Sequence, residues 1–88
     1  MAKRYTFRAR QLEAWGNAVD GFDVNNVWNI GEFSTSARDE ARAFTRYLKR
    51  CGITFRKGCT RIWCDGDNYT IEDRKTGEPL FDAVLIDY

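Results

Sequence analysis

The sequence predicts an α+β domain in which a mainly antiparallel sheet carries one amphipathic helix on one face, in the order β-β-α-β-β-β. Three observations predict this class. Residues 4–12 alternate between apolar and polar side chains, residues 37–51 repeat apolar side chains at helical spacing, and residues 59–88 hold three strand-like segments. A chain of 88 residues that is 43% hydrophobic is expected to form a single globular domain over 1–88.

The first two predicted strands are separated by a polar interruption. In residues 4–12 the apolar side chains alternate with arginines and a threonine, which is typical of a strand with one buried side. Glycine, asparagine and aspartate interrupt this pattern over residues 16–26. The alternation resumes at residues 27–33, so we expect a second strand there, antiparallel to the first.

The predicted helix covers residues 37–51. Ser36 and Asp39 have the spacing of a capping box, in which a hydroxyl and an acid each bond a backbone amide at the helix start. Gly52 stands where a left-handed residue ends a helix. A helical projection places these apolar residues in one sector as the core-facing stripe: Ala37, Ala41, Phe44, Leu48 and Cys51.

Three further strands are predicted at residues 59–64, 69–73 and 80–88, joined by two turns that contain glycine. Pro79 lies at the start of the last one, where the missing backbone N–H is tolerated. The nearly continuous apolar character of residues 81–86 indicates that this strand is central in the sheet.

The composition argues against catalysis and cofactors. The chain has no histidine, the usual general base at neutral pH, so we expect no enzyme, with a small enzyme kept only as a remote alternative. Its three cysteines include no CxxC pair, which is a poor disulfide or zinc framework. No apolar run approaches the roughly 18 residues that cross a bilayer. We therefore expect a cytoplasmic protein with no membrane contact, cofactor or metal.

Two groups of residues with side-chain oxygen atoms resemble calcium-binding sites in composition. The run Asp65-Gly-Asp-Asn68 begins like an EF-hand loop, but threonines stand where that loop needs glycine and glutamate. The second group has no recognised spacing, and turn formation explains its composition: Asp20, Asp23, Asn25 and Asn26.

Basic side chains offer a nucleic-acid hypothesis. Residues 1–57 hold 11 Lys/Arg against 6 Asp/Glu, whereas residues 58–88 hold 3 against 7. A basic arc opposite the helix core stripe fits phosphate contacts, although a solvated helix face has the same pattern. A second basic row, Arg4, Arg8 and Arg10, follows the polar side of the first strand. The arc consists of Arg38, Arg42, Arg46, Lys49 and Arg50.

The polar segment between Trp15 and Trp28 is the candidate protein-binding loop. It contains Val19, Phe22 and Val24, and these apolar side chains either fold back as a small satellite core or are presented to a partner. The residues assigned to partner binding are Trp15, Asn17, Phe22, Asn25 and Asn26.

The run AWGNAVDGFDVNN, residues 14–26, resembles a motif of small phage and mobile-element proteins of gut bacteria. The similarity is best over residues 5–28 and weaker at residues 47–50 and 75–81. It implies a mobile-element origin and carries over no catalytic residues. Together these patterns predict a non-catalytic adaptor or inhibitor that docks a protein partner, as a monomer or homodimer. The alternative is a nucleic-acid-binding accessory protein that uses the basic helix face.

Overall fold

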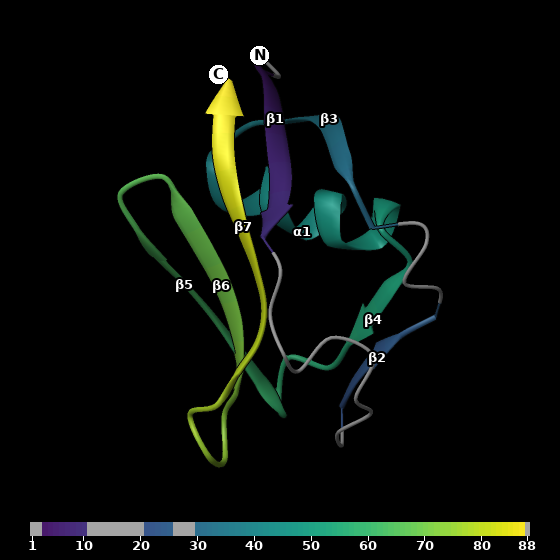
Figure 1. Ribbon diagram of the computed structural model, residues 1–88, viewed down its shortest axis with the longest axis vertical. Helices are drawn as coiled ribbons and strands as arrows, with labels where there is room; N and C mark the ends of the chain where they lie inside the picture. Colours follow the sequence, from purple (N-terminus) through teal and green to yellow (C-terminus); the bar gives the residue numbers. More distant parts are fainter. Residues whose placement is uncertain (1–2, 11–20, 26–29, 88) are drawn as a thin grey trace.

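The computed structural model describes residues 3–10, 21–25 and 30–87 of the chain (Figure 1). A five-stranded antiparallel sheet has the strand order β3-β1-β7-β6-β5, and a separate two-stranded ribbon pairs β2 with β4. The elements are β1 (Lys3–Arg10), β2 (Phe22–Val24), β3 (Glu32–Ala37), α1 (Glu40–Arg50), β4 (Ile53–Phe55), β5 (Thr60–Asp65), β6 (Asn68–Asp73) and β7 (Pro79–Asp87).

The predicted class, a mostly antiparallel sheet with one helix, is confirmed, but the predicted element order is wrong. Two short strands, β2 before β3 and β4 after the helix, interrupt the predicted order, and they pair with each other. Each has only three residues. A segment this short is below the length at which alternation can be recognised, so the sequence pattern does not reveal either strand.

The second strand lies later in the chain than predicted. The prediction places it at residues 27–33, whereas β3 runs over Glu32–Ala37 and pairs antiparallel with β1. Residues 27–29 lie outside the described part of the chain. In β3, three consecutive small polar residues, 34–36, separate Phe33 from Ala37, and such residues are equally typical of the approach to a helix.

The predicted capping box is also wrong. Asp39 is the N-cap: its backbone is extended, and its side chain accepts a hydrogen bond from the amide of Arg42 at 2.9 Å. Ser36 belongs to β3 instead, so α1 begins three residues later than the predicted start at residue 37. The end of the helix agrees with the prediction, because Gly52 follows it with a left-handed φ of 80°.

The C-terminal strands follow the predicted plan. β5 and β6 face each other from Asp65 opposite Asn68, and Gly66, the first residue of the two-residue turn between them, has a φ of 61°. A positive φ at this position is typical of the primed hairpin turns. β7 begins at Pro79 and lies at the centre of the sheet between β1 and β6, as its apolar run predicted.

The core lies between α1 and the sheet. The helix packs mainly on β3, and also on β1 and β4. Phe7 of β1 contacts the rings of Phe44, Tyr47 and Tyr69 with centroids 5.3–5.6 Å apart. Such fully buried aromatic side chains each contribute roughly 1.5–3 kcal/mol of apolar transfer free energy. The predicted helix stripe needs correction: Phe44 and Leu48 are buried, but Ala41 is exposed, and the buried helix residues are Ala43, Phe44, Tyr47 and Leu48.

Among the described residues, α1 is neither long enough nor apolar enough to cross a membrane.

Candidate functional site

The predicted binding loop is described only in part. Trp15, Asn17 and Asn26 lie outside the described residues. The side chain of Phe22 is only 2% exposed and belongs to the main core, where β2 places it opposite Phe55 of β4. Because the ring is buried within the chain itself, it does not form a contact surface for a partner, and it packs in the main core rather than in a satellite core.

Asn25, the other described member of the loop site, connects β2 to the segment after the helix. Its backbone N–H donates to the carbonyl oxygen of Gly52 at 3.0 Å, and its side-chain amide donates to Thr54 Oγ1 at 3.2 Å. Both groups bond the chain's own β4 region. The sequence predicted that Asn25 contacts a partner, whereas the structure shows it in contacts within the chain.

The basic arc predicted on the helix is solvent-exposed, and three of its members have partners within the chain. The guanidinium of Arg42 lies 3.7 Å from the carboxylate of Asp39, Arg46 donates to the carbonyl oxygen of Ser36, and the guanidinium of Arg50 lies 5.1 Å from the centre of the Phe33 ring. Exposed ion pairs of this kind contribute at most about 1 kcal/mol, so the helix side keeps a strong excess of positive charge.

A groove between α1 and β4 extends this basic side. Lys49 of the helix and Lys57, just after β4, line it together with the half-buried ring of Phe55. Threonine side chains and Ile53 complete the walls. Sequence reasoning missed Lys57 and Phe55 because they belong to, or follow, a strand that was not predicted.

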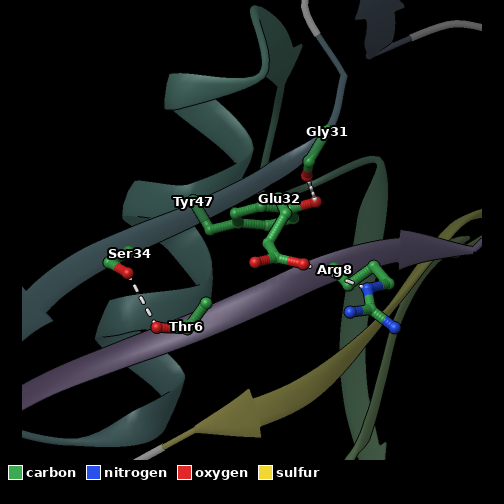
Figure 2. Close-up of polar contacts among 6 residues, drawn as sticks. All are labelled: Thr6, Arg8, Gly31, Glu32, Ser34 and Tyr47. Carbon is green, nitrogen blue, oxygen red and sulfur yellow. Dashed lines mark hydrogen bonds and ion pairs between the residues drawn. The ribbon is translucent and has the colours of Figure 1, made fainter.

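The arginine row of β1 lies on the opposite side of the sheet from the helix. Arg8 contacts Glu32 of β3 at 3.1 Å, and Thr6 shares a hydrogen bond with Ser34 at 2.7 Å (Figure 2). Arg10 lies 3.8 Å from Asp82 of β7 and donates to Asn68 at 2.9 Å. The two predicted basic rows therefore do not form one surface.

This uncovered face of the sheet, the side without α1, has mixed charge. Side chains of both signs alternate across the strands, and neither sign prevails. The cationic members are Arg4, Arg8, Arg10 and Arg61, and the anionic members are Glu32, Asp65, Glu72, Asp82 and Asp87.

Trp63 is the most exposed large hydrophobic residue that the structure describes. Its side chain lies on the uncovered face of β5 and is 42% exposed, with Ile86 of β7 next at 39%. The indole Nε1 donates to Glu72 Oε2 at 2.9 Å, and Arg61 lies 4.0 Å from the same carboxylate. These contacts hold the ring in place while leaving its surface accessible.

The strand that carries Trp63 is an edge strand. No described strand lies beyond β5 in the sheet. In a hairpin closed by a two-residue turn, Asp65 and Asn68 form a hydrogen-bonded pair, and the pairs alternate from there. The backbone N–H and C=O groups of Trp63 therefore bond β6, whereas those of Ile62 and Cys64 point away from β6, toward the free edge. The outer edge of β3 differs, because Arg46 bonds the Ser36 carbonyl there and Tyr47 bonds the carbonyl of Gly31 just before it (Figure 2).

The titratable groups in the core have structural roles. Burial raises the pKa of the Tyr47 phenol and, together with the nearby Glu40 carboxylate, that of Tyr69. Both hydroxyls have acceptors: Tyr47 donates to the carbonyl oxygen of Gly31, and Tyr69 to Glu40. Burial also raises the pKa of the Cys51 thiol, which is fully enclosed and so inaccessible as a nucleophile.

Asp82 is the least well satisfied polar group in the described part of the chain. Its Oδ1 atom is buried and has no hydrogen-bond partner among the described residues. Burial raises the pKa of this carboxyl, and the Arg10 guanidinium, a backbone amide and the Thr70 hydroxyl partly offset that effect. The position lies under the uncovered face, two strands from Trp63.

The described residues contain no cluster of three or more side chains suited to a metal ion. Asp20 and Asn26 of the second calcium-like group lie outside this part of the chain. The three cysteines are free, with Cys64 exposed.

In the comparisons with known proteins, no family model, curated protein or solved structure matches the chain, so its own residues must support any functional inference.

Proposed function

We propose that the chain is a non-catalytic binding protein that docks a protein partner through the surface around Trp63. The observation that supports this most directly is the position of an exposed tryptophan beside the unpaired edge of β5 among the described strands. Tryptophan is among the residues that dominate interface energetics, because it buries a large rigid surface at a low entropic cost.

The charge of the uncovered face favours a protein partner over a nucleic acid on this side. Nucleic-acid surfaces carry an excess of positive charge that neutralises phosphates. Here the arginines face carboxylates of neighbouring strands, as in the contacts of Arg8 with Glu32 and of Arg10 with Asp82. Protein interfaces commonly combine such a mixed polar rim with an aromatic centre.

The biological setting is part of the proposal. The similarity of residues 14–26 to a mobile-element motif supports an adaptor or inhibitor encoded by a phage or mobile element. The free thiols of Cys51, Cys59 and Cys64 are in keeping with a reducing compartment, so we place the protein in the cytoplasm.

Capture of partners with matched variants tests the docking surface. The wild-type protein, Trp63→Ala and Ile86→Ala are immobilised and exposed to lysates of candidate hosts. Ile86 is the matched control, because it is similarly exposed but lies in β7, separated from β5 by β6. We expect a partner that wild type and Ile86→Ala retain and Trp63→Ala does not. Equal recovery by all three proteins would contradict the proposed site, and so would a wild-type protein that retains neither a host protein nor a tagged second copy of the chain.

A second candidate function is nucleic-acid binding on the helix side. The specific observation is the groove between α1 and β4, in which Lys49 and Lys57 lie beside the ring of Phe55. Two lysines can bind successive phosphates, and an aromatic ring offers a surface on which a base stacks. This surface lies on the other side of the sheet from Trp63, so the two functions can be tested independently.

A further inference from the structure

We propose that a second copy of this chain pairs along β5, so that the two sheets join across an antiparallel β5–β5 edge centred on Trp63. This inference rests on the proposed function, since it names a partner for the same site. The two copies would form one continuous ten-stranded sheet, because each contributes five strands.

The backbone of β5 has the groups that such pairing requires. Ile62 and Cys64 direct their N–H and C=O groups away from β6, as the hairpin register shows. When Trp63 lies opposite Trp63 of the second copy, Ile62 lies opposite Cys64. Both members of that pair then have outward-facing groups, so they form a hydrogen-bonded pair, and symmetry repeats it on the other side of the centre.

The side chains of β5 are self-complementary in this register. Arg61 of one copy lies opposite Asp65 of the other, twice by symmetry, and the two Trp63 rings lie side by side at the centre. These are non-hydrogen-bonded pairs, in which side chains of opposing strands approach most closely. Asp65 has no ion-pair partner within the described part of its own chain, so the second copy supplies one.

Other in-phase registers do not keep this complementarity. The outward-facing N–H and C=O groups of the two copies stay opposite each other only when the register shifts in steps of two residues. A shift that centres the pair on Ile62 places Arg61 opposite Trp63 and removes the contact with Asp65. A shift that centres it on Cys64 places Asp65 opposite Trp63 and moves Arg61 to the turn residue Asp67.

The rest of the fold leaves room for the second copy. A twofold axis perpendicular to the sheet puts both helices on the same side, but α1 packs mainly on β3, β1 and β4, and at its near end Glu40 bonds Tyr69 of β6, one strand away from β5. Figure 1 shows α1 crossing behind β7 and β1, with the β5–β6 hairpin beyond its first turn. The other edge strand, β3, is less suitable because Arg46 already bonds its Ser36 carbonyl.

Sedimentation of charge variants tests the pairing. Arg61→Asp alone places two carboxylates opposite each other, and Asp65→Arg alone places two guanidinium groups opposite each other. We expect each single variant to raise the dissociation constant of the dimer about tenfold, since two attractive pairs become repulsive. A mixture of the two single variants restores attraction between opposite charges in one heterodimer, so it should associate more tightly than either variant alone. The double variant Arg61→Asp/Asp65→Arg should also dimerise.

Thiol cross-linking tests the register. The pair of Ile62 with Cys64 has a Cα separation of about 5.5 Å in the proposed register, within the range of a disulfide. We therefore expect Ile62→Cys to form an oxidised dimer, and Ile62→Cys/Cys64→Ser to form none. A cross-link in the latter variant would show a centre at Ile62, and one in wild type through Cys64 would show a centre at Cys64. Either result overturns the register.

The outcomes separate this inference from the proposed function. A wild-type chain that stays monomeric up to about 1 mM overturns the dimer. If Trp63→Ala still fails to retain a captured partner of different sequence, the proposed function stands and the edge binds another protein. If the chain dimerises with unchanged affinity in both single charge variants and in their mixture, the dimer uses another surface and the β5 pairing is wrong. Circular dichroism confirms that each variant is folded.

Discussion

Gly21 lies so close to Cys59 that a Cβ atom at position 21 would be 2.3 Å from the Cβ of Cys59 and 2.8 Å from its Sγ. Gly21 also has a left-handed φ of 81°, and its carbonyl oxygen accepts a hydrogen bond from the amide of Arg56 at 2.7 Å. The segment before β2 is thus fixed to the segment between β4 and β5. Only glycine satisfies both the backbone conformation and the close contact.

Gly21→Ala is therefore expected to destabilise the protein by about 3 kcal/mol, because a left-handed alanine costs about 1–2 kcal/mol and the contact with Cys59 adds a clash. Gly66→Ala is the matched control. It has a left-handed φ of 61° but no atom within 4 Å of the new Cβ, so only the conformational cost of about 1 kcal/mol should appear. Urea unfolding of both variants measures the difference. Equal destabilisation would show that the close contact relaxes without cost.

Asp39→Ala should destabilise the protein by about 1 kcal/mol, because it removes the side chain that accepts the Arg42 amide at the start of α1. Ser36→Ala tests the capping residue that the sequence predicted. Its side chain lies on β3, so we expect a change within about 0.5 kcal/mol. Thermal and urea unfolding provide the measurement. A larger effect of Ser36→Ala than of Asp39→Ala would restore the predicted capping box.

The strands and helix that the sequence revealed are those with a long regular pattern. β1, β6 and β7 alternate or run apolar over six or more residues, and α1 has apolar residues at helical spacing. β2 and β4 were not predicted, because three residues are too few to show an alternating pattern. The shift of β3 has another cause: its serines and threonine are as typical of a helix start as of an exposed strand, and only pairing with β1 decides between them.

The candidate site was less predictable than the fold. The sequence placed Arg61 and Trp63 on one side of a strand, but nothing local shows that this strand has a free edge. Phe22 illustrates the same limit, since its burial depends on β4, a strand distant in the chain that was not predicted. Edges, and contacts between distant segments, follow from strand order, which a single sequence does not encode locally.

The buried carboxyl of Asp82 should make stability depend on pH. Burial raises its pKa above the ordinary 3.8, so the folded state keeps this proton at pH values where the unfolded chain has released it. The contribution of this group to stability therefore falls as the pH rises from 3.8 through the raised pKa.

Asp82→Asn removes this ionisation and keeps the shape of the side chain. We expect the variant to be more stable than wild type at neutral pH, with the difference disappearing below pH 3.8. Urea unfolding over a series of pH values measures it, with the exposed Asp23→Asn as a control for the removal of one negative charge. A variant that is less stable than wild type at neutral pH would mean that the contact with Arg10 outweighs the cost of burial.

The groove between α1 and β4 gives the sharpest test of nucleic-acid binding. Charge reversal at Arg42 and Arg46 would change folding stability as well as charge, because Arg42 contacts Asp39 and Arg46 bonds the Ser36 carbonyl. Lys49 and Lys57 have no ion-pair partner in the described part of the chain, so their reversal changes charge with little effect on packing.

Lys49→Glu/Lys57→Glu should therefore weaken binding of a labelled single-stranded oligonucleotide by about tenfold or more, and reduce the slope of log affinity against log salt by about 1 for each phosphate that the protein no longer neutralises. Fluorescence anisotropy over a salt series measures both quantities. Arg4→Glu/Lys75→Glu changes the net charge equally at exposed positions outside the groove, and should keep most of the affinity. Equal weakening in the two double variants would show that net charge alone, and not the groove, accounts for the binding. No binding by wild type at about 50 mM salt would exclude the function, because phosphate contacts strengthen as salt falls.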